Sequence, residues 1–186
     1  MITHLCRLVF VDETGFRTHM GRKRGRAPKG ERVVCGLRKR SPSYTLIGGM
    51  GVYGMVGKRL IPKALTLPKM IEYIEQVLIP ELPAGSWVIW DNWDVHRAPW
   101  VQYLFRKAGV ILLFQARYSP DMNPIEQAWT KIKTLVRGRR PRSAKELREA
   151  VAWAWDQIDR LDISNFFEHA GLVVAPPINI NCSSTR

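Results

Sequence analysis

The sequence predicts an α/β fold built on a mixed five-stranded sheet flanked by helices, and three observations favour it. Short apolar runs rich in β-branched residues alternate with longer segments of helical periodicity along most of the chain. Two of the apolar runs stop at an acid, Asp12 and Asp91, which is typical of buried strands that end at one edge of a sheet. With 186 residues, 46% of them hydrophobic, the chain can bury a core of its own.

The first half of the chain supplies four of the expected strands and one helix. Two of the strands form a hairpin, because glycines stand on both sides of its turn. The helix shows apolar residues at helical spacing, with Pro68 at its start and Pro80 at its end. In chain order we expect strands over 8–12, 44–50 and 55–61, the helix over 67–78, and a fourth strand over 86–90.

The second half supplies three helices and the fifth strand. Gly109 ends the first of these helices, and the second begins at Pro124 with Asn123 as its cap. A capping box of Ser143 and Glu146 opens the last one. In chain order we expect a helix over 100–108, a strand over 110–114, and helices over 124–136 and 144–158, the last with Trp153 and Trp155 in the core or an interface.

Three carboxylates are expected to meet at one edge of this sheet. Asp12 and Asp91 each end a strand, and Glu126 falls in the first turn of the helix that begins at Pro124. Oxygen-only ligands suit hard cations such as Mg²⁺ or Mn²⁺ rather than Zn²⁺. Two such ions, roughly 3.5–4 Å apart, can activate a hydroxyl and stabilise the leaving oxygen of a phosphodiester. The pattern predicts a two-metal phosphoryl-transfer site that needs no covalent nucleophile.

Each of these acids also has a structural interpretation. Asp12 or Asp91 alone is typical of a turn residue after a strand. Asn123 and Glu126 have the spacing of a capping box, in which the glutamate bonds back to the cap backbone. The catalytic interpretation rests on the conjunction of all three acids, with 34 residues (92–125) between the second and the third, in a strongly basic chain.

Three stretches of the sequence resemble the catalytic domain of DDE transposases. They are Phe10-Val11-Asp12-Glu13-Thr14-Gly15, then Asp91-Asn92 followed by His96, and Tyr118-Ser119-Pro120-Asp121-Met122-Asn123-Pro124-Ile125-Glu126. The last block is highly specific, whereas the first is weak on its own. The chain resembles the mariner-like bacterial insertion sequences of the IS-six-thirty type, over about residues 8–171.

This resemblance implies a ribonuclease-H-like fold and cut-and-paste DNA transposition. Asp12, Asp91 and Glu126 would be the metal-binding catalytic triad, with two Mg²⁺ or Mn²⁺ ions as cofactors. The partners would be DNA, at the element ends and at the target, and a second copy of the chain in a homodimer. The resemblance further implies a bacterial protein of the cytoplasm, associated with the nucleoid, that has no small-molecule substrate.

Positive charge is concentrated in one segment. The formal net charge of +13 and a pI near 10.2 indicate a polyanionic partner. Between Arg17 and Arg40 there are ten Lys or Arg and one acid, without clear periodicity. The resemblance implies that this loop, 17–43, is a clamp that touches DNA and the partner subunit, and a merely disordered basic loop is the alternative. Its candidate DNA-binding residues are Arg22, Lys23, Arg24 and Arg26.

Further candidate residues lie near the triad. Lys133 and Arg137 follow Glu126 at helical spacing, where they could hold DNA phosphates or belong to a solvated helix face. Asn92 could orient the neighbouring acid or contact a metal-bound water. His96 could contact a phosphate or a metal ion. For both of these, structural hydrogen bonding is the alternative.

The domain boundaries follow from the same resemblance. We expect one catalytic domain over 1–171 and a tail, 172–186, that matches no known pattern and is disordered. Transposases of this branch typically carry an N-terminal helix-turn-helix region, for which this chain has no room, and a small residue where this chain has Trp93. The alternative function is therefore a catalytically silent, truncated remnant that acts only as a DNA-binding or dimerisation module.

Other classes of protein are excluded by composition. Cys6, Cys35 and Cys182 show neither paired nor metal-type spacing, so we expect free thiols in a reducing compartment. No apolar run approaches the ~20 residues of a membrane span, and the N-terminus does not have the pattern of a signal peptide. The chain is therefore expected to work without a membrane.

Overall fold

The computed structural model describes residues 7–18, 20, 26–32, 41–116 and 122–172. Its strands are β1 (Leu8–Arg17), β2 (Ser43–Gly51), β3 (Gly54–Pro62), β4 (Trp87–Trp90) and β5 (Ile111–Phe114). Its helical elements are α2 (Leu67–Tyr73), the π-helical segment η1 (Ile74–Leu78), α3 (Ile79–Glu81), α4 (Pro99–Lys107), α5 (Ile125–Arg139), α6 (Ala144–Asp156) and α7 (Arg160–His169).

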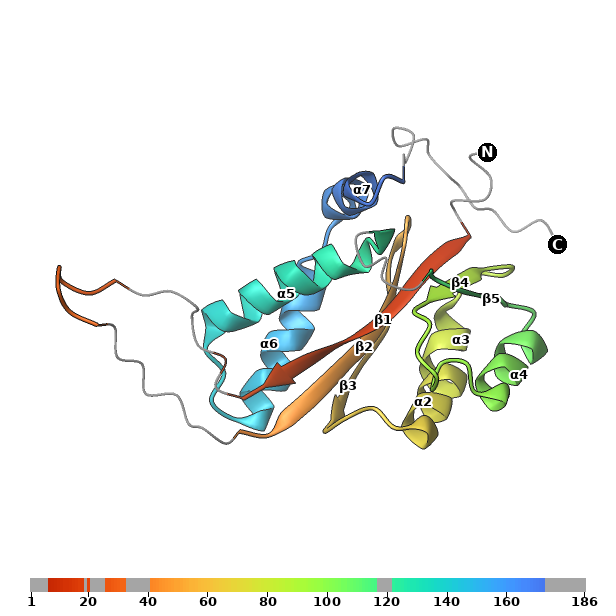
Figure 1. Cartoon of the computed structure of the whole chain (residues 1–186), viewed down its shortest axis with the longest axis horizontal. Helices are drawn as coiled ribbons and strands as arrows, with labels where there is room; N and C mark the ends of the chain where they lie inside the picture. Colours follow the sequence, from red (N-terminus) through yellow and green to blue (C-terminus); the bar gives the residue numbers. More distant parts are fainter. Residues whose placement is uncertain (1–6, 19, 21–25, 33–40, 117–121, 173–186) are drawn as a thin grey trace.

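The strands form one mixed sheet in the order β3-β2-β1-β4-β5 (Figure 1). β1 pairs antiparallel with β2 and parallel with β4, while β3 extends the antiparallel side and β5 the parallel side. The predicted five-stranded α/β architecture is confirmed. The central position of β1 places Asp12 in the middle of the sheet rather than at its rim.

Helices cover both faces of the sheet, and each face has its own core (Figure 1). α5, α6 and α7 pack on one face, where Phe10 of β1 meets Phe167 of α7 with ring centroids 5.7 Å apart. α2, η1 and α4 pack on the other face, against Val9 and Val11. Successive residues of a strand point to opposite faces. Asp12 therefore faces the α5 side of the sheet, and Glu13 faces the other side.

The first strand is longer than predicted. We expected it to end at Asp12, but β1 continues to Arg17, and Asp12 pairs with Gly48 of β2. The strand continues because Thr14 and Phe16 are buried and β2 supplies hydrogen-bond partners as far as Ser43. β4 stops at Trp90, so Asp12 lies just beyond the parallel part of the pairing, and Asp91 follows β4 directly as predicted.

Two helical predictions also need correction. The helix predicted over 67–78 runs on through Pro80 to Glu81 as α2, η1 and α3. The helix predicted over 144–158 ends at Asp156, and a separate helix, α7, follows. Asp159 opens α7 by accepting from the backbone N–H of Asp162 at 2.8 Å, while Asp162 accepts from the backbone N–H of Asp159. That capping box was readable in the sequence.

The part of the basic segment that the structure describes leaves the sheet from a fixed base. The Thr18 backbone N–H donates to the Pro42 carbonyl at 3.3 Å, which joins the two ends of the segment. Arg26 is exposed. The predictions for Arg22, Lys23 and Arg24, and for the tail over 173–186, lie outside the described residues. No helix in the described part of the chain is both long enough and apolar enough to span a bilayer.

Candidate active site

Asp12 lies on β1, and Asp91 directly follows β4, the parallel neighbour of β1. β1 and β4 pair through Phe10 and Ile89, and Asp12 and Asp91 each follow two residues later. Neighbouring strands are about 4.8 Å apart, so the backbones of the two acids come side by side at the end of the parallel pairing. We expected the acids to meet at an edge of the sheet, whereas the register puts Asp12 and Asp91 beside each other at its centre, because β1 continues past Asp12 to Arg17.

Asp12 is held from the α5 side of the sheet. The indole Nε1–H of Trp129 donates to Asp12 Oδ2 at 2.9 Å. Burial raises the pKa of Asp12 to about 7, and the neighbouring charges of Glu13 and Glu126 add to the rise, against which the hydrogen bond from Trp129 acts. A carboxyl group in this position gains most from a cation, because a cation would relieve both the burial and the repulsion.

Trp129 is itself fixed by a second tryptophan. Its side chain is 1% exposed, and its ring lies 6.2 Å from that of Trp155 on α6. Trp155 fits against Gly48, the β2 partner of Asp12, where an added Cβ would clash with the Trp155 ring. The absence of a side chain at Gly48 thus lets Trp155 support the residue that orients Asp12.

Glu126 reaches the same neighbourhood from the first turn of α5. It lies three residues before Trp129, and residues at that spacing share one helix face. The charge of Glu126 helps to raise the pKa of Asp12. Asn123 Oδ1 accepts from the Ile125 backbone N–H at 3.4 Å, but α5 begins at Ile125 and Pro124 takes the cap position, one residue later than predicted. Among the described residues the Glu126 carboxylate has no bond back to that cap, which leaves it exposed and available.

Asp91 is held by a different partner. Its Oδ1 is hydrogen-bonded to His96 Nδ1 and also accepts from the Trp93 backbone N–H at 3.1 Å. Partial burial alone would raise the pKa of Asp91, but the His96 contact and the Trp93 N–H lower it below its usual value. The side chain is 49% exposed, and both contacts fall on one oxygen. The second oxygen can therefore face a ligand.

His96 is a fully buried cation between two carboxylates. Its ring is stacked on Trp90 with centroids 4.3 Å apart, and its Nε2 lies 3.2 Å from Glu13 Oε1, within ion-pair reach but outside hydrogen-bond geometry. Burial alone would lower the pKa of His96, yet Asp91 and Glu13 raise it to about 9. The sequence left a structural role open for His96. Its contact with Asp91 makes it the residue that holds that carboxylate.

The remaining predicted residues are placed less tightly. Asn92 follows Asp91 and is partly buried, as are Lys133 and Arg137 on α5. Lys133 and Arg137 lie seven and eleven residues after Glu126, two and three turns along the same helix. The sequence analysis assigned no role to Trp129. No local signal could have found its bond to Asp12, because 117 positions separate the two residues.

The described carboxylates do not yet form a closed metal site. No three His, Cys, Asp or Glu side chains in the described ranges are arranged to hold one ion. The reason is visible in their partners, since Trp129 holds Asp12 on one face while His96, beside Glu13, holds Asp91 toward the other. The donor chemistry nevertheless fits a hard divalent cation, because the three acids offer only oxygen and Asp12 sits in uncompensated negative charge.

Fold and site together define a nuclease-type α/β domain with acids at the centre of its sheet. The chain belongs to the DDE superfamily endonucleases, the family that matches it over residues 7–148. The family expected from the sequence is thereby confirmed. The bacterial branch within it is a finer assignment that this match does not address.

Relatives and solved structures agree with this assignment. The Tcb1 and Tcb2 transposases of transposable elements in Caenorhabditis briggsae are 32% identical over 84 residues and 34% identical over 68 residues. These segments are 45% and 37% of this chain, but only 31% and 25% of those proteins. The chain thus matches less than a third of either transposase.

Among solved structures, the fold is similar to that of Mos1 transposase. The paired-end complex of Mos1 transposase with the left transposon end gives a TM-score of 0.74 at 16% identity, covering 89% of this chain and 52% of that one. The catalytic domain of Mos1 mariner transposase gives 0.62 at 17% identity, covering 90% and 80%. This likeness shows the fold, which is the ribonuclease-H-like fold predicted from the sequence.

Proposed function

We propose that the chain is the catalytic domain of a transposase, which cleaves DNA strands at the ends of a mobile element and joins the freed 3′-hydroxyl to target DNA. One observation carries the proposal. Asp12 and Asp91 each follow the last paired residues of β1 and β4 by two positions, and α5, which carries Glu126, is bonded to Asp12 through Trp129. Membership of the DDE endonuclease family supports the same reaction class.

Asp12, Asp91 and Glu126 would hold the divalent cations, which we infer to be two Mg²⁺ or Mn²⁺ ions. When bound, such ions supply activation of the attacking hydroxyl and stabilisation of the leaving oxygen. The protein's own part is positioning. Trp129 orients the carboxylate of Asp12, and His96 keeps that of Asp91 ionised and fixed through one oxygen.

The DNA would lie along the basic surfaces of the chain. Arg22, Lys23, Arg24 and Arg26 in the segment between β1 and β2, and Lys133 and Arg137 on α5, would contact phosphates. The net charge of +13 supports a polyanionic ligand without naming its sequence. We infer that residues 1–171 form the catalytic domain and that the segment over 17–43 acts as a clamp.

The finer assignments are proposals of the same kind. We infer a homodimer that acts on a pair of element ends, in keeping with the paired-end complex of the Mos1 relative. We also infer the mariner-like bacterial branch of IS-six-thirty type, from the specific block that ends at Glu126. A bacterial enzyme of this class would act at the nucleoid.

A second candidate function has one observation in its favour. The described acids are not arranged around a common ion, as a catalytically silent remnant that only binds DNA or dimerises would allow. Such a remnant would keep the basic surface and the fold. Binding DNA or dimerising would not require Asp12 on β1, Asp91 after β4 or Glu126 on α5.

Cleavage of a DNA end in Mn²⁺ separates the two functions. Asp91→Asn and Glu126→Gln should abolish metal-dependent cleavage and strand transfer while leaving DNA binding in place. Asp94→Asn is the matched control, since Asp94 is an exposed acid on the same turn as Asp91 and should keep full activity. Cleavage that survives in both variants, or that is absent from the wild-type chain with bound Mn²⁺, would overturn the catalytic proposal.

A further inference from the structure

An exposed tryptophan stands immediately beside the candidate active site. Trp93 lies two residues after Asp91, and 45% of its surface is exposed. Its backbone N–H donates to Asp91 Oδ1 at 3.1 Å, so the residue is tied to the acid itself. Burial of a large aromatic ring is favourable, and the exposed part of this ring does not contribute that free energy. Its exposure at such a place needs an explanation other than core packing.

The ring of Trp93 is held in place from beneath. It meets His96 edge to face, with centroids 5.3 Å apart and planes at 89°, and His96 is stacked in turn on buried Trp90. The backbone N–H groups of His96 and Arg97 donate to the Trp93 carbonyl at 3.0 and 3.3 Å. The three rings thus contact one another in series, the first pair stacked and the second edge to face, and Trp93 is the member that solvent reaches. A ring fixed on one side and open on the other can accept a flat ligand at little cost in conformational entropy.

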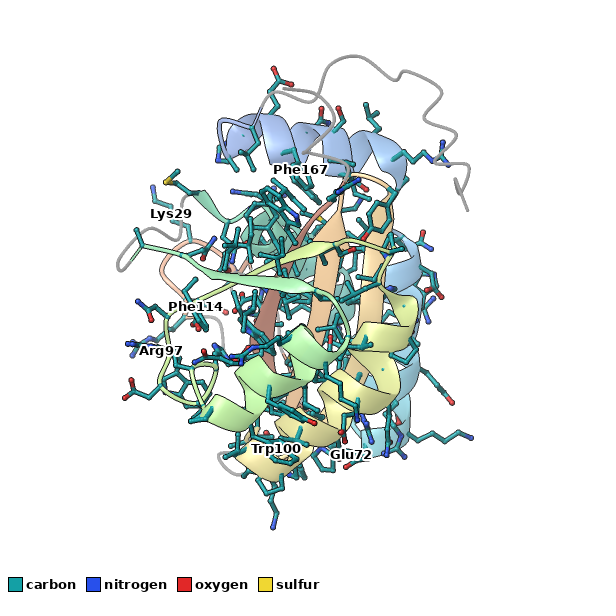
Figure 2. The ribbon with its side chains drawn as sticks, turned by 90° about the vertical axis from the view of Figure 1, so that its right-hand side faces the viewer. Lys29, Glu72, Arg97, Trp100, Phe114 and Phe167 are labelled. Atoms are coloured by element: carbon teal, nitrogen blue, oxygen red, sulfur yellow. The ribbon has the colours of Figure 1, made fainter. Side chains whose placement is uncertain are left out.

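A cation lies on the same turn. Arg97 is exposed, follows Trp93 by four residues, and forms no ion pair with any other residue in the described ranges. Figure 2 shows it at the periphery of the molecule. Asp94, on the same turn, is the opposing charge. An aromatic platform beside an arginine is the combination by which proteins hold unpaired bases and their phosphates.

We propose that Trp93 and Arg97 form a stacking site for one unpaired base of the DNA strand at the active site. The base lies on the open side of the Trp93 indole, and Arg97 contacts a phosphate next to it. This inference rests on the proposed function and adds a feature of the substrate. Bases inside a duplex are covered by their neighbours, so the site selects a strand whose end is frayed or whose base is turned out of the stack.

The proposal assigns a role to a residue that sets this chain apart. The sequence pattern that the chain resembles has a small residue where Trp93 stands. A small residue offers no platform. The base-stacking site is therefore a property of this chain and of those that share its tryptophan, and it does not depend on how Asp12 or Glu126 acts.

Fluorescence of 2-aminopurine provides the test, in buffer with EDTA so that no cleavage can occur. Two short duplexes are compared, one with a single-stranded end that carries the fluorescent base and one fully paired. The wild type should bind the open end more tightly than the paired duplex and quench its fluorescence. Trp93→Ala should lose roughly tenfold in affinity for the open end only, the loss of about one base–aromatic stack. Trp93→Phe should keep most of the preference.

The controls separate stacking from folding and from charge. Trp100→Ala removes another tryptophan, 54% exposed on α4, and should change neither affinity. Arg97→Ala should lower the affinity for both duplexes and reduce the salt dependence of binding. A wild type without preference for the open end, or a Trp93→Ala variant that is folded by circular dichroism and keeps the preference, would overturn the proposal. Failure of the catalytic proposal is seen separately, as metal-dependent cleavage that survives Asp91→Asn.

Discussion

The two aspartates of the site are alike in chemistry and position but lie in opposite electrostatic surroundings. Asp12 lies under helix α5, beside two other acids, and its pKa is raised to about 7. Asp91 lies on a turn against buried His96, and its pKa is lowered. The difference shows that one half of the site is poised to take up positive charge, while the other already has it.

This contrast follows from which face of the sheet each side chain uses. Trp129 offers Asp12 a neutral N–H, which orients the carboxyl group without cancelling its charge. His96 offers Asp91 a charged ring that Glu13 also stabilises. A cation bound at the site would stabilise the charged form of Asp12 more than that of Asp91, because burial and two neighbouring acids disfavour a charge on Asp12, whereas His96 already stabilises the charge on Asp91.

The largest effects are expected from neutralising each acid. Asp12→Asn and Asp91→Asn should both lower the rate of DNA cleavage on the order of a thousandfold or more, the scale seen when one member of a catalytic unit is removed. Their effects on stability should be opposite. At pH 8 without metal, Asp12→Asn should raise the unfolding temperature by a few degrees, because a buried charge is removed. Asp91→Asn should lower the unfolding temperature, because His96 loses its partner.

Equal shifts in the same direction would mean that the two halves are not electrostatically distinct. Asp94→Asn, an exposed acid close to Asp91, is the control and should leave the unfolding temperature and the cleavage rate unchanged.

The next effect concerns the residue that orients Asp12. Trp129→Phe keeps the ring and removes the N–H donor, and it should lower Mn²⁺ affinity about 10–100-fold, as loss of a partner behind a metal ligand typically does. Trp153→Phe alters a partly buried indole on α6 that stacks with Arg139, and it should leave Mn²⁺ affinity unchanged. Calorimetric titration of both variants measures the difference. Equal Mn²⁺ affinity in Trp129→Phe and wild type would show that the bond to Asp12 is only structural.

The pH dependence of stability should separate the halves without any ligand. The pKa of Asp12 rises from 3.8 to about 7 on folding. Protonation of Asp12 therefore stabilises the folded state fully below pH 3.8, and this stabilisation is lost as the pH rises towards 7, the acidic window. The pKa of His96 rises from 6.5 to about 9 on folding. Protonation of His96 therefore stabilises the folded state fully below pH 6.5, and this stabilisation is lost as the pH rises through 9, the alkaline window.

Urea unfolding in EDTA at a series of pH values tests these two windows. Asp12→Asn should flatten the loss of stability in the acidic window alone, and His96→Ala should flatten it in the alkaline window alone. If either variant flattened both windows, the assignment of one window to each half would be wrong.

The smallest effects are expected from the basic segment between β1 and β2. Replacing Arg22, Lys23 and Arg24 with Ala should weaken DNA binding and make its salt dependence less steep, by up to about 0.9 for each phosphate that the chain no longer neutralises. Mn²⁺ affinity should not change. Lys145→Ala on α6, an exposed lysine beside Glu149, is the control for general charge. An unaltered salt slope in the triple variant would remove the segment from the DNA-binding surface.

Sequence reasoning predicted the sheet, the position of Asp91 and the helix of Glu126 because each leaves a local signal. It placed the end of β1 wrongly, since Asp12, Glu13, Thr14 and Gly15 resemble a turn, and only pairing with β2 keeps them extended. It also carried α6 on to residue 158 and did not predict α7. The bonds from Trp129 to Asp12 and from His96 to Asp91 depend on tertiary packing, and these contacts determine how the two carboxylates differ.

The central claim is that Asp12 and Asp91 act on the same metal ions. Calorimetric titration of Mn²⁺ into the folded chain, with and without a short DNA duplex, tests it most directly when wild type is compared with Asp12→Asn, Asp91→Asn and the control Asp94→Asn. Wild type and Asp94→Asn should bind Mn²⁺, and Asp12→Asn and Asp91→Asn should not. Binding that survives in either variant, or that wild type lacks even with DNA present, would contradict it.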